Sequence, residues 1–313
     1  MATNDACANC GAAMQGEYCA ACGQRRFRPE DRRFAHLVTE SLGTLTDLDG
    51  RLWRSFRALM LQPGRIARDW IDGRRAYWIS PVRLFLLANL VYFLAPVVTD
   101  LNLPLHNQVR GEAYRQLLPE RCADTDGVPR CQWGGQYHSR LTEPLFMRKL
   151  ARERDEAAAR DETFDAPGFE HRYNAQSGAI GKLLVIIHVP FVALMLWLVA
   201  WRRKPPRYYA EHFVAALGLV TFVLVLMPLF KPVWWLYVLG HRAIGLPGAG
   251  VATIFGYASL AVILAHFALA CRRCYDSRWP AATLQGVAAF LALGMASIYV
   301  YRPLQFVLAL WTM

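Results

Sequence analysis

The sequence predicts an all-α integral membrane protein with about five transmembrane helices and a small four-cysteine zinc ribbon at its N-terminus. Of the 313 residues, 55% are hydrophobic, whereas an ordinary soluble domain has about 45–50%. The apolar residues are gathered into blocks, and several blocks reach the ~20 residues that cross a bilayer core. Two Cys-x-x-Cys-Gly motifs precede these blocks. The composition therefore excludes a single soluble domain.

Four cysteines near the N-terminus form the predicted metal site: Cys7, Cys10, Cys19 and Cys22. Each Cys-x-x-Cys supplies two ligands from one tight turn, and four thiolates give Zn²⁺ a closed tetrahedral site without a position for water. Gly11 and Gly23 follow the two pairs and permit the positive φ of such turns. We expect a structural Zn²⁺, with a redox dithiol as the alternative. So small a ribbon has no core without its metal, so it has to hold a protein partner, a nucleic acid or its own chain.

Residues 27–80 predict basic amphipathic helices that lead to the first membrane span. Apolar residues recur at helical spacing over 34–45 and 52–60, and Pro63 can open a further helix that Gly73 closes. The polar sides carry Arg51, Arg54, Arg57, Arg65, Arg68, Arg74 and Arg75. Two interpretations stay open together: the helices lie on anionic membrane lipids, or they pack on one another and on the spans as a scaffold.

Five apolar segments are predicted to cross the membrane, at 81–98, 180–201, 213–230, 251–271 and 282–300. Arg302 and Pro303 separate the last span from a short apolar tail, which we expect to be an interfacial or bent extension. The predicted organisation has five parts. They are the cytoplasmic zinc ribbon (1–26), the basic helices (27–80), the first span (81–98), an extracytoplasmic loop domain (99–179), and the remaining spans with the tail (180–313).

Basic residues in the short loops predict the orientation in the membrane. The loops 202–212 and 272–281 are rich in arginine, whereas the loop 231–250 carries only Lys231 and Arg242. With five spans, the arginine-rich loops and the N-terminus lie on one face. We therefore expect a protein of the bacterial inner membrane with a cytoplasmic N-terminus. The polar first 80 residues also lack the apolar stretch of a secretory signal peptide.

The predicted extracytoplasmic loop contains two cysteines, Cys122 and Cys131, separated by eight residues. An oxidising compartment permits a disulfide there, which would stabilise by roughly 2–3 kcal/mol on the chain-entropy model; two free thiols are the alternative. The segment 143–164 is rich in Ala, Arg and Glu and predicts a solvated, charged helix. A substrate-binding cap is the alternative for this helix.

Ionisable residues inside the spans are candidates for a buried polar site, because they are costly in lipid. Glu211 and His212 begin the third span, and His266 on the fourth span is expected to approach them near the inner face. The simpler interpretation is that each histidine bonds to a neighbouring helix. Cys271 and Cys274 form a further Cys-x-x-Cys, interpreted as interfacial thiols, with a second metal site as the alternative.

The chain resembles a known bacterial membrane family in four segments: "CANCG…YCAACGQ", "PGRIARDWIDGRRAYWISPVRLFLL", "YYAEHFV" and "YDSRW". This is domain-of-unknown-function family 3667. The resemblance touches most of the chain outside 100–179, and it implies a multi-pass inner-membrane protein with a zinc-ribbon head and no established activity. Members often carry further histidines after "EHFV", where this chain reads "AALGLVTF". Any chemistry of those histidines is therefore not expected here.

Three functions compete on the sequence. The first is a non-enzymatic protein whose ribbon and basic helices dock a cytosolic protein partner or act as a scaffold. The second is a small transporter or permease using the intramembrane histidines, and the third is a membrane enzyme acting on lipid or envelope precursors. The sequence has none of the common nucleotide-binding, metalloprotease or hydrolase motifs, which favours the first. Nucleic acid is not expected as a partner, because only Tyr18 and Phe27 lie among the nearby arginines.

Overall fold

The computed structural model describes residues 6–26, 50–94, 103–117, 122–125, 128–131, 136–201, 207–244 and 248–313. The predicted helix over 34–45 lies outside these residues. The chain divides into two compact units, here called unit 1 (residues 1–99 and 188–293) and unit 2 (residues 100–187 and 294–313). The described part is helical except for a two-stranded hairpin and the ribbon bridges, so the all-α class is confirmed.

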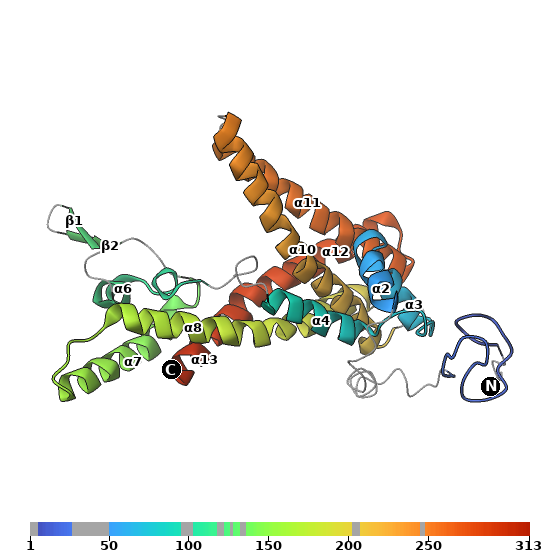
Figure 1. The fold of residues 1–313 in the computed structure, drawn as a ribbon, viewed down its shortest axis with the longest axis horizontal. Coiled ribbons are helices and arrows are strands. Elements are labelled where there is room, and N and C mark those ends of the chain that lie inside the picture. Colours follow the sequence, from blue (N-terminus) through green and yellow to red (C-terminus); the bar gives the residue numbers. More distant parts are fainter. Residues whose placement is uncertain are drawn as a thin grey trace. The chain divides into compact units, whose positions relative to one another are not determined.

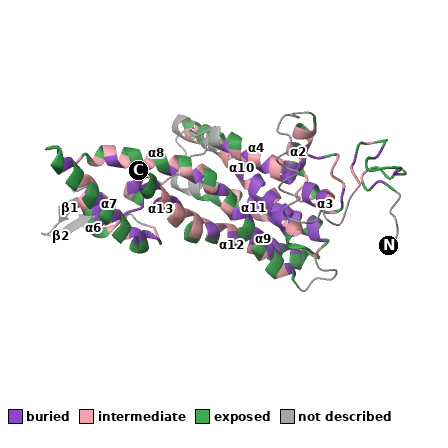
Figure 2. Ribbon diagram, turned by 90° about the horizontal axis from the view of Figure 1, so that it is seen from below, coloured by how far each residue is buried: buried purple, intermediate pink, exposed green. Residues whose placement is uncertain are grey.

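Unit 1 contains the ribbon and the elements α2 (Gly50–Leu61), α3 (Arg65–Ile71), α4 (Pro81–Leu94), α9 (His188–Ala200), α10 (Tyr209–Ile244), α11 (Gly248–Tyr275) and most of α12 (Trp279–Ala296), as Figure 1 shows. Helix α10 packs against α3, α4, α9 and α11. In the most apolar 18-residue stretch of α10, 61% of the residues are buried, against 33% in each of the other long apolar helical runs. Figure 2 colours the whole chain by burial. Helix α10 is therefore the central helix of unit 1.

Four helical runs are long and apolar enough to cross a membrane: Ala166–Ala200, Tyr209–Phe230, Gly256–Tyr275 and Trp279–Thr312. They contain or overlap the second to fifth predicted spans. At the first predicted span the structure has a shorter apolar helix, Pro81–Tyr92, and residues 95–98 lie outside the described part. The described helices thus give four spans by length and a fifth apolar helix that begins where the sequence predicts it.

Prolines mark the places where these long helices change their hydrogen-bonding pattern. A 3₁₀ turn, η4 (Val185–Ile187), precedes Pro190, and a π-helical turn, η5 (Ser297–Tyr301), precedes Pro303. A proline inside a helix removes one backbone donor and its ring crowds the preceding turn, so the chain adjusts there. By contrast, α10 continues as a helix through Pro228 and Pro232 to Ile244, where the sequence predicted a loop from residue 231.

Unit 2 contains η2 (Leu105–Asn107), α6 (Gly111–Leu117), β1 (Cys122–Thr125), β2 (Val128–Cys131), α7 (Ser139–Ala159), α8 (Ala166–Leu184), η4, η5 and α13 (Arg302–Thr312). Its core is apolar and largely aromatic, with Phe146, Phe169, Tyr173 and Phe306 all at most 1% exposed. Helix α13 packs against α7 and α8. The C-terminal tail therefore continues the last helical run and packs into the core of unit 2.

Helix α7 confirms the charged helix predicted around residues 143–164, although it ends at Ala159. Its apolar face is not solvated: Phe146 and Leu150 are fully buried in the core of unit 2. On its polar side, Glu153 pairs with Lys149 and with Arg172 of α8. The helix is thus amphipathic and anchored, because apolar residues recur on one face among the charges.

Candidate metal centre and arginine platform

The ribbon places its four cysteine sulfurs together. All four Sγ atoms lie within 4.8 Å of one another, and they form the only such ligand group of three or more residues in the described part of the chain. The Sγ atoms of Cys7 and Cys22 are 3.6 Å apart, as are those of Cys10 and Cys19. A tetrahedral Zn²⁺ with ligands at about 2.3 Å requires sulfur–sulfur edges of about 3.8 Å. The donor set therefore fits a four-coordinate thiophilic metal.

The two halves of the ribbon repeat the same backbone structure twelve positions apart. The amide of Gly11 donates to the Cys7 carbonyl at 2.8 Å, and the amide of Gly23 donates to the Cys19 carbonyl at 2.8 Å. Gly11 has φ +76° and Gly23 has φ +71°, a conformation that glycine adopts without a steric cost. The bridges Ala6–Ala13 and Tyr18–Arg25 close the two loops. Each loop thus presents one Cys-x-x-Cys to the shared centre.

Hydrogen bonds among the ribbon thiols shift their ionisation in opposite directions. A bond with the Ala12 backbone lowers the pKa of Cys10, but bonds with the neighbouring thiols raise it to about 12. Burial opposes ionisation of Cys22, but hydrogen bonds involving Asn9, the Gln24 backbone and the neighbouring thiols lower its pKa to about 6. Cys7 and Cys19 are buried and form the small core of the ribbon with Met14. A core this small leaves most of the folding free energy to the metal.

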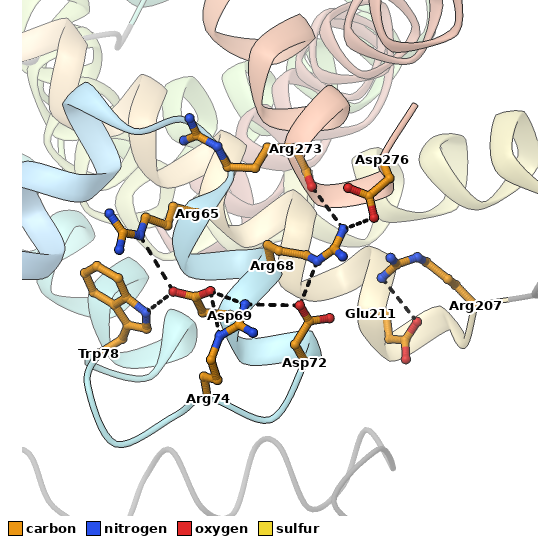
Figure 3. A network of polar contacts seen from close by, with 10 residues as sticks. All are labelled: Arg65, Arg68, Asp69, Asp72, Arg74, Trp78, Arg207, Glu211, Arg273 and Asp276. Atoms are coloured by element: carbon orange, nitrogen blue, oxygen red, sulfur yellow. Dashed lines mark hydrogen bonds and ion pairs between the residues drawn. The ribbon is translucent and has the colours of Figure 1, made fainter. Parts of the chain in front are cut away.

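A network of arginines and aspartates joins α3 to the turn that follows it (Figure 3). Asp69 Oδ1 accepts hydrogen bonds from Arg74 Nε at 3.0 Å and Nη2 at 2.6 Å, and its Oδ2 accepts from the Trp78 indole at 2.8 Å. Asp72 pairs with Arg68 at 2.7 Å and with Arg74 at 3.1 Å. The hydrogen bond to Asp69 raises the pKa of Arg74. We call residues 50–80, which comprise α2, α3 and the turn after each helix, the arginine platform.

The platform is also fixed to the end of α11. Arg68 pairs with Asp276 and donates to the Arg273 carbonyl at 3.3 Å. Burial lowers the pKa of Arg68, but Asp72 and Asp276 raise it by more, so the net shift is upward. Arg273 in turn donates to the Pro63 carbonyl at 2.9 Å. Basic side chains suit this place, because the last turn of a helix carries unpaired carbonyls and partial negative charge.

Several of the seven predicted surface arginines therefore form ion pairs or contact aromatic rings within unit 1. Besides Arg68 and Arg74, three lie over aromatic rings: Arg54 is 4.1 Å from the Tyr77 centroid, Arg75 5.0 Å from Trp70 and Arg65 5.6 Å from Trp78. Arg57 is exposed. The structure thus supports the scaffold interpretation for most of the set. The partner aspartates were not among the predicted site residues, although Arg65–Asp69 and Arg68–Asp72 have the i,i+4 spacing that signals such pairs.

The predicted polar site of Glu211, His212 and His266 is not one cluster in the structure. His212 Nδ1 lies 2.8 Å from the Tyr275 hydroxyl, and Glu211 lies 3.7 Å from Arg207. His266 stacks on Phe222 with ring centroids 3.4 Å apart. Residues 266 and 275 are nine positions apart on α11, about 13 Å along the helix. His212 thus hydrogen-bonds the neighbouring helix α11, as the simpler interpretation predicted, whereas the contact shown for His266 is a ring stacking with α10.

Cys271 and Cys274, which the sequence analysis interprets as interfacial thiols, are buried within unit 1, each 2% exposed. They line a cavity of about 30 Å³ together with His266 and Tyr275. A cavity of this size holds about one or two waters. Ala58, Leu59 and Gly64 line the same cavity as the two thiols, a proximity that the local sequence cannot reveal.

In unit 2, β1 and β2 pair antiparallel with Cys122 opposite Cys131. Directly opposed residues of an antiparallel pair have Cα atoms about 4.5–5.5 Å apart, within the range that a disulfide spans. The backbone register is thus compatible with the predicted bridge, which remains a prediction.

The fold and the sites define a class: an all-α protein with membrane-type helices, a four-cysteine head and an arginine platform next to the first apolar helix. Residues 49–93 match the family model described as "Protein of unknown function (DUF3667)", which confirms the resemblance in the second of the four segments, residues 63–87. The matched residues comprise α2, α3 and nearly all of α4. No curated protein and no solved structure matches the chain.

Proposed function

We propose that the protein is a non-enzymatic scaffold of the bacterial inner membrane, whose cytoplasmic zinc-bearing ribbon and arginine platform dock a cytosolic protein partner. The observation that carries the proposal is the cluster of four cysteine sulfurs within 4.8 Å of one another, because four thiolates would fill every corner of a tetrahedral metal site. A closed site supplies structure rather than a reactive position. Zn²⁺ is the metal that such a set of four thiolates most commonly holds in structural sites.

The platform supports the same proposal. Its arginines and aspartates are tied to each other, to aromatic rings and to α11, so they build a rigid surface rather than a loose basic patch. Loops rich in Lys and Arg favour the cytoplasmic side, and the ribbon and platform precede the first apolar helix in the chain. These features support a cytoplasmic location for the head.

Membrane lipids are the second partner that we propose for the platform side of unit 1. Trp53 is 70% and Trp279 is 50% exposed, and Arg272 lies 4.2 Å from the Trp279 ring centroid. Tryptophan and arginine are the side chains that settle at the level of lipid head groups. Arg57, which is also exposed, suits the same anionic surface.

A co-purification experiment on the full-length protein tests partner docking. The parent and the Cys10→Ser variant are crosslinked in cells, purified in detergent and compared by mass spectrometry, with Cys274→Ala as a control that leaves the ribbon intact. We expect one cytosolic protein to co-purify with the parent and the control and to be lost with Cys10→Ser. The same partners with all three proteins would contradict the proposal.

The competing transporter function makes a different prediction, because it requires His266. This side chain stacks on Phe222 beside a cavity that accommodates only about one or two waters. Flux into liposomes that falls with His266→Ala would favour a transporter over the scaffold. Altered membrane lipids on deletion of the protein would favour an enzyme acting on lipid or envelope precursors.

A further inference from the structure

The ribbon contacts the arginine platform of its own chain through one side chain, Gln24. Its Oε1 accepts hydrogen bonds from the backbone amides of Ala76 at 2.7 Å and Arg75 at 3.1 Å. Gln24 is only 7% exposed, and its Nε2 donates to the Arg25 carbonyl at 3.0 Å. Both polar atoms of the amide group are thus used. The contact joins residues 51 and 52 positions apart in sequence.

The metal loop fixes the position of Gln24. The Gln24 carbonyl accepts from the Cys19 amide at 2.9 Å, and Gln24 lies two residues after Cys22. The neighbouring pair Tyr18–Arg25 and the bond from the Arg26 amide to the Glu17 carbonyl at 2.6 Å close the same loop. Because so small a loop depends on its metal for structure, the orientation of the Gln24 side chain depends on the metal as well.

The receiving turn belongs to the platform and leads into the first apolar helix. The Arg74 amide donates to the Asp69 carbonyl at 2.8 Å, and the Ile79 amide donates to Ser55 Oγ at 3.1 Å. The Arg75 amide is shared with the Gly73 carbonyl at 3.1 Å. For the Ala76 amide, Gln24 is the acceptor that the structure shows. This amide therefore reports the contact, whereas its neighbours at 74 and 79 report the platform alone.

We propose that the ribbon is a metal-dependent latch on its own chain, in which the loaded four-cysteine centre holds Gln24 against the amides of Arg75 and Ala76. The inference rests on the metal-bearing head of the proposed function and adds a partner within the chain. Metal loss releases the turn at the start of α4. By thermodynamic linkage, latch closure strengthens metal binding by the same factor by which metal favours closure.

Amide hydrogen exchange on the full-length protein in detergent tests the latch, with the metal content of each sample measured first. We expect the Ala76 amide to be protected in the Zn²⁺-loaded parent and to exchange at least about fivefold faster after chelation. The amides of Arg74 and Ile79 are expected to keep their protection. Protection at Ala76 that is unchanged by removal of bound Zn²⁺ would overturn the latch.

Three variants separate the latch from general damage to the ribbon. Gln24→Met keeps the side-chain length but removes the acceptor, so Ala76 should exchange as fast in the loaded variant as in the chelated parent. Gln24→Glu retains an acceptor and should restore protection. Gln15→Met, at an exposed position of the same ribbon, should behave as the parent. Equal protection in Gln24→Met and Gln15→Met would contradict the proposal.

Metal affinity gives an independent measurement. Competition with a chelator should show Zn²⁺ affinity lower by about five- to thirtyfold in Gln24→Met than in Gln15→Met. Equal affinities would mean that the contact is not linked to the metal. Two results together distinguish failure of the latch from failure of the proposed function. If the cytosolic partner is lost in the Cys10→Ser variant while exchange of the Ala76 amide in the parent does not depend on metal, docking is retained and the latch is absent.

Discussion

The indole N–H of Trp78 donates a hydrogen bond to Asp69 Oδ2 at 2.8 Å, so the residue that closes the platform turn is bonded to the middle of α3. The other oxygen of Asp69 holds Arg74. Trp78 is 4% exposed, and its indole therefore has its donor satisfied away from water. One carboxylate thus connects the helix, the turn and the buried aromatic ring.

Substitution Asp69→Asn should destabilise unit 1 by about 1–3 kcal/mol, because it removes the charge from the nearer of the two carboxylate partners of Arg74 and weakens the acceptor for the Trp78 indole. Thermal unfolding in detergent measures the effect as a lower Tm. Asp276→Asn is the matched control, since Asp276 is 66% exposed and such a pair contributes at most about 1 kcal/mol. Equal Tm values for Asp69→Asn and the parent would show that the network is not structural.

Substitution Gly64→Ala should disrupt the contact between the platform and α11. Gly64 has φ +74°, and an added Cβ would lie 2.4 Å from the Ala270 carbonyl oxygen, a backbone atom that cannot move independently. We expect a loss of more than about 2 kcal/mol, from the strained φ and the overlap together. Gly294→Ala meets nothing within 4 Å and should retain or raise Tm. The prediction fails if both variants unfold at the parent temperature.

The stability of unit 2 should fall as the pH is lowered towards 4, because burial and the nearby Arg302 lower the pKa of His138 to about 4. The ordinary pKa of histidine is about 6.5, so between these values the unfolded chain binds a proton that the folded chain does not. Stability is therefore full above about pH 6.5 and is lost progressively below it. Hydrogen exchange of α7 as a function of pH measures this loss.

The variant His138→Asn should have a flatter pH dependence of unit 2 stability than the parent. Asparagine retains an amide donor for Thr142, which lies 3.3 Å from His138 Nδ1. Parallel pH profiles for the parent and His138→Asn would contradict the assignment.

Protein purified from an oxidising compartment should contain a disulfide between Cys122 and Cys131. The opposed positions of these residues in the hairpin permit the bridge. Alkylation before and after reduction, followed by mass spectrometry, should show two protected thiols in this segment alone. Free thiols at both positions would argue against an extracytoplasmic unit 2.

Local patterns determined much of this protein. The spacing of apolar residues predicted α2 and the long helices, and the Cys-x-x-Cys-Gly repeats predicted the ribbon centre, because each of these depends on residues close in sequence. Pro190 and Pro303 likewise coincide with changes in helix type. Such features depend on local backbone geometry and on the periodicity of apolar residues, and both can be predicted from residues close in sequence.

Contacts between distant segments required the tertiary structure. The sequence did not reveal that Arg68 pairs with Asp276 or that Cys271 and Cys274 are buried. It also did not reveal that His266 and His212 have separate partners. It also could not show that the tail packs into unit 2 or that Gln24 reaches Ala76. The physical reason is that periodicity fixes which face of a helix is apolar, whereas the neighbour that covers this face is chosen by packing across the whole chain.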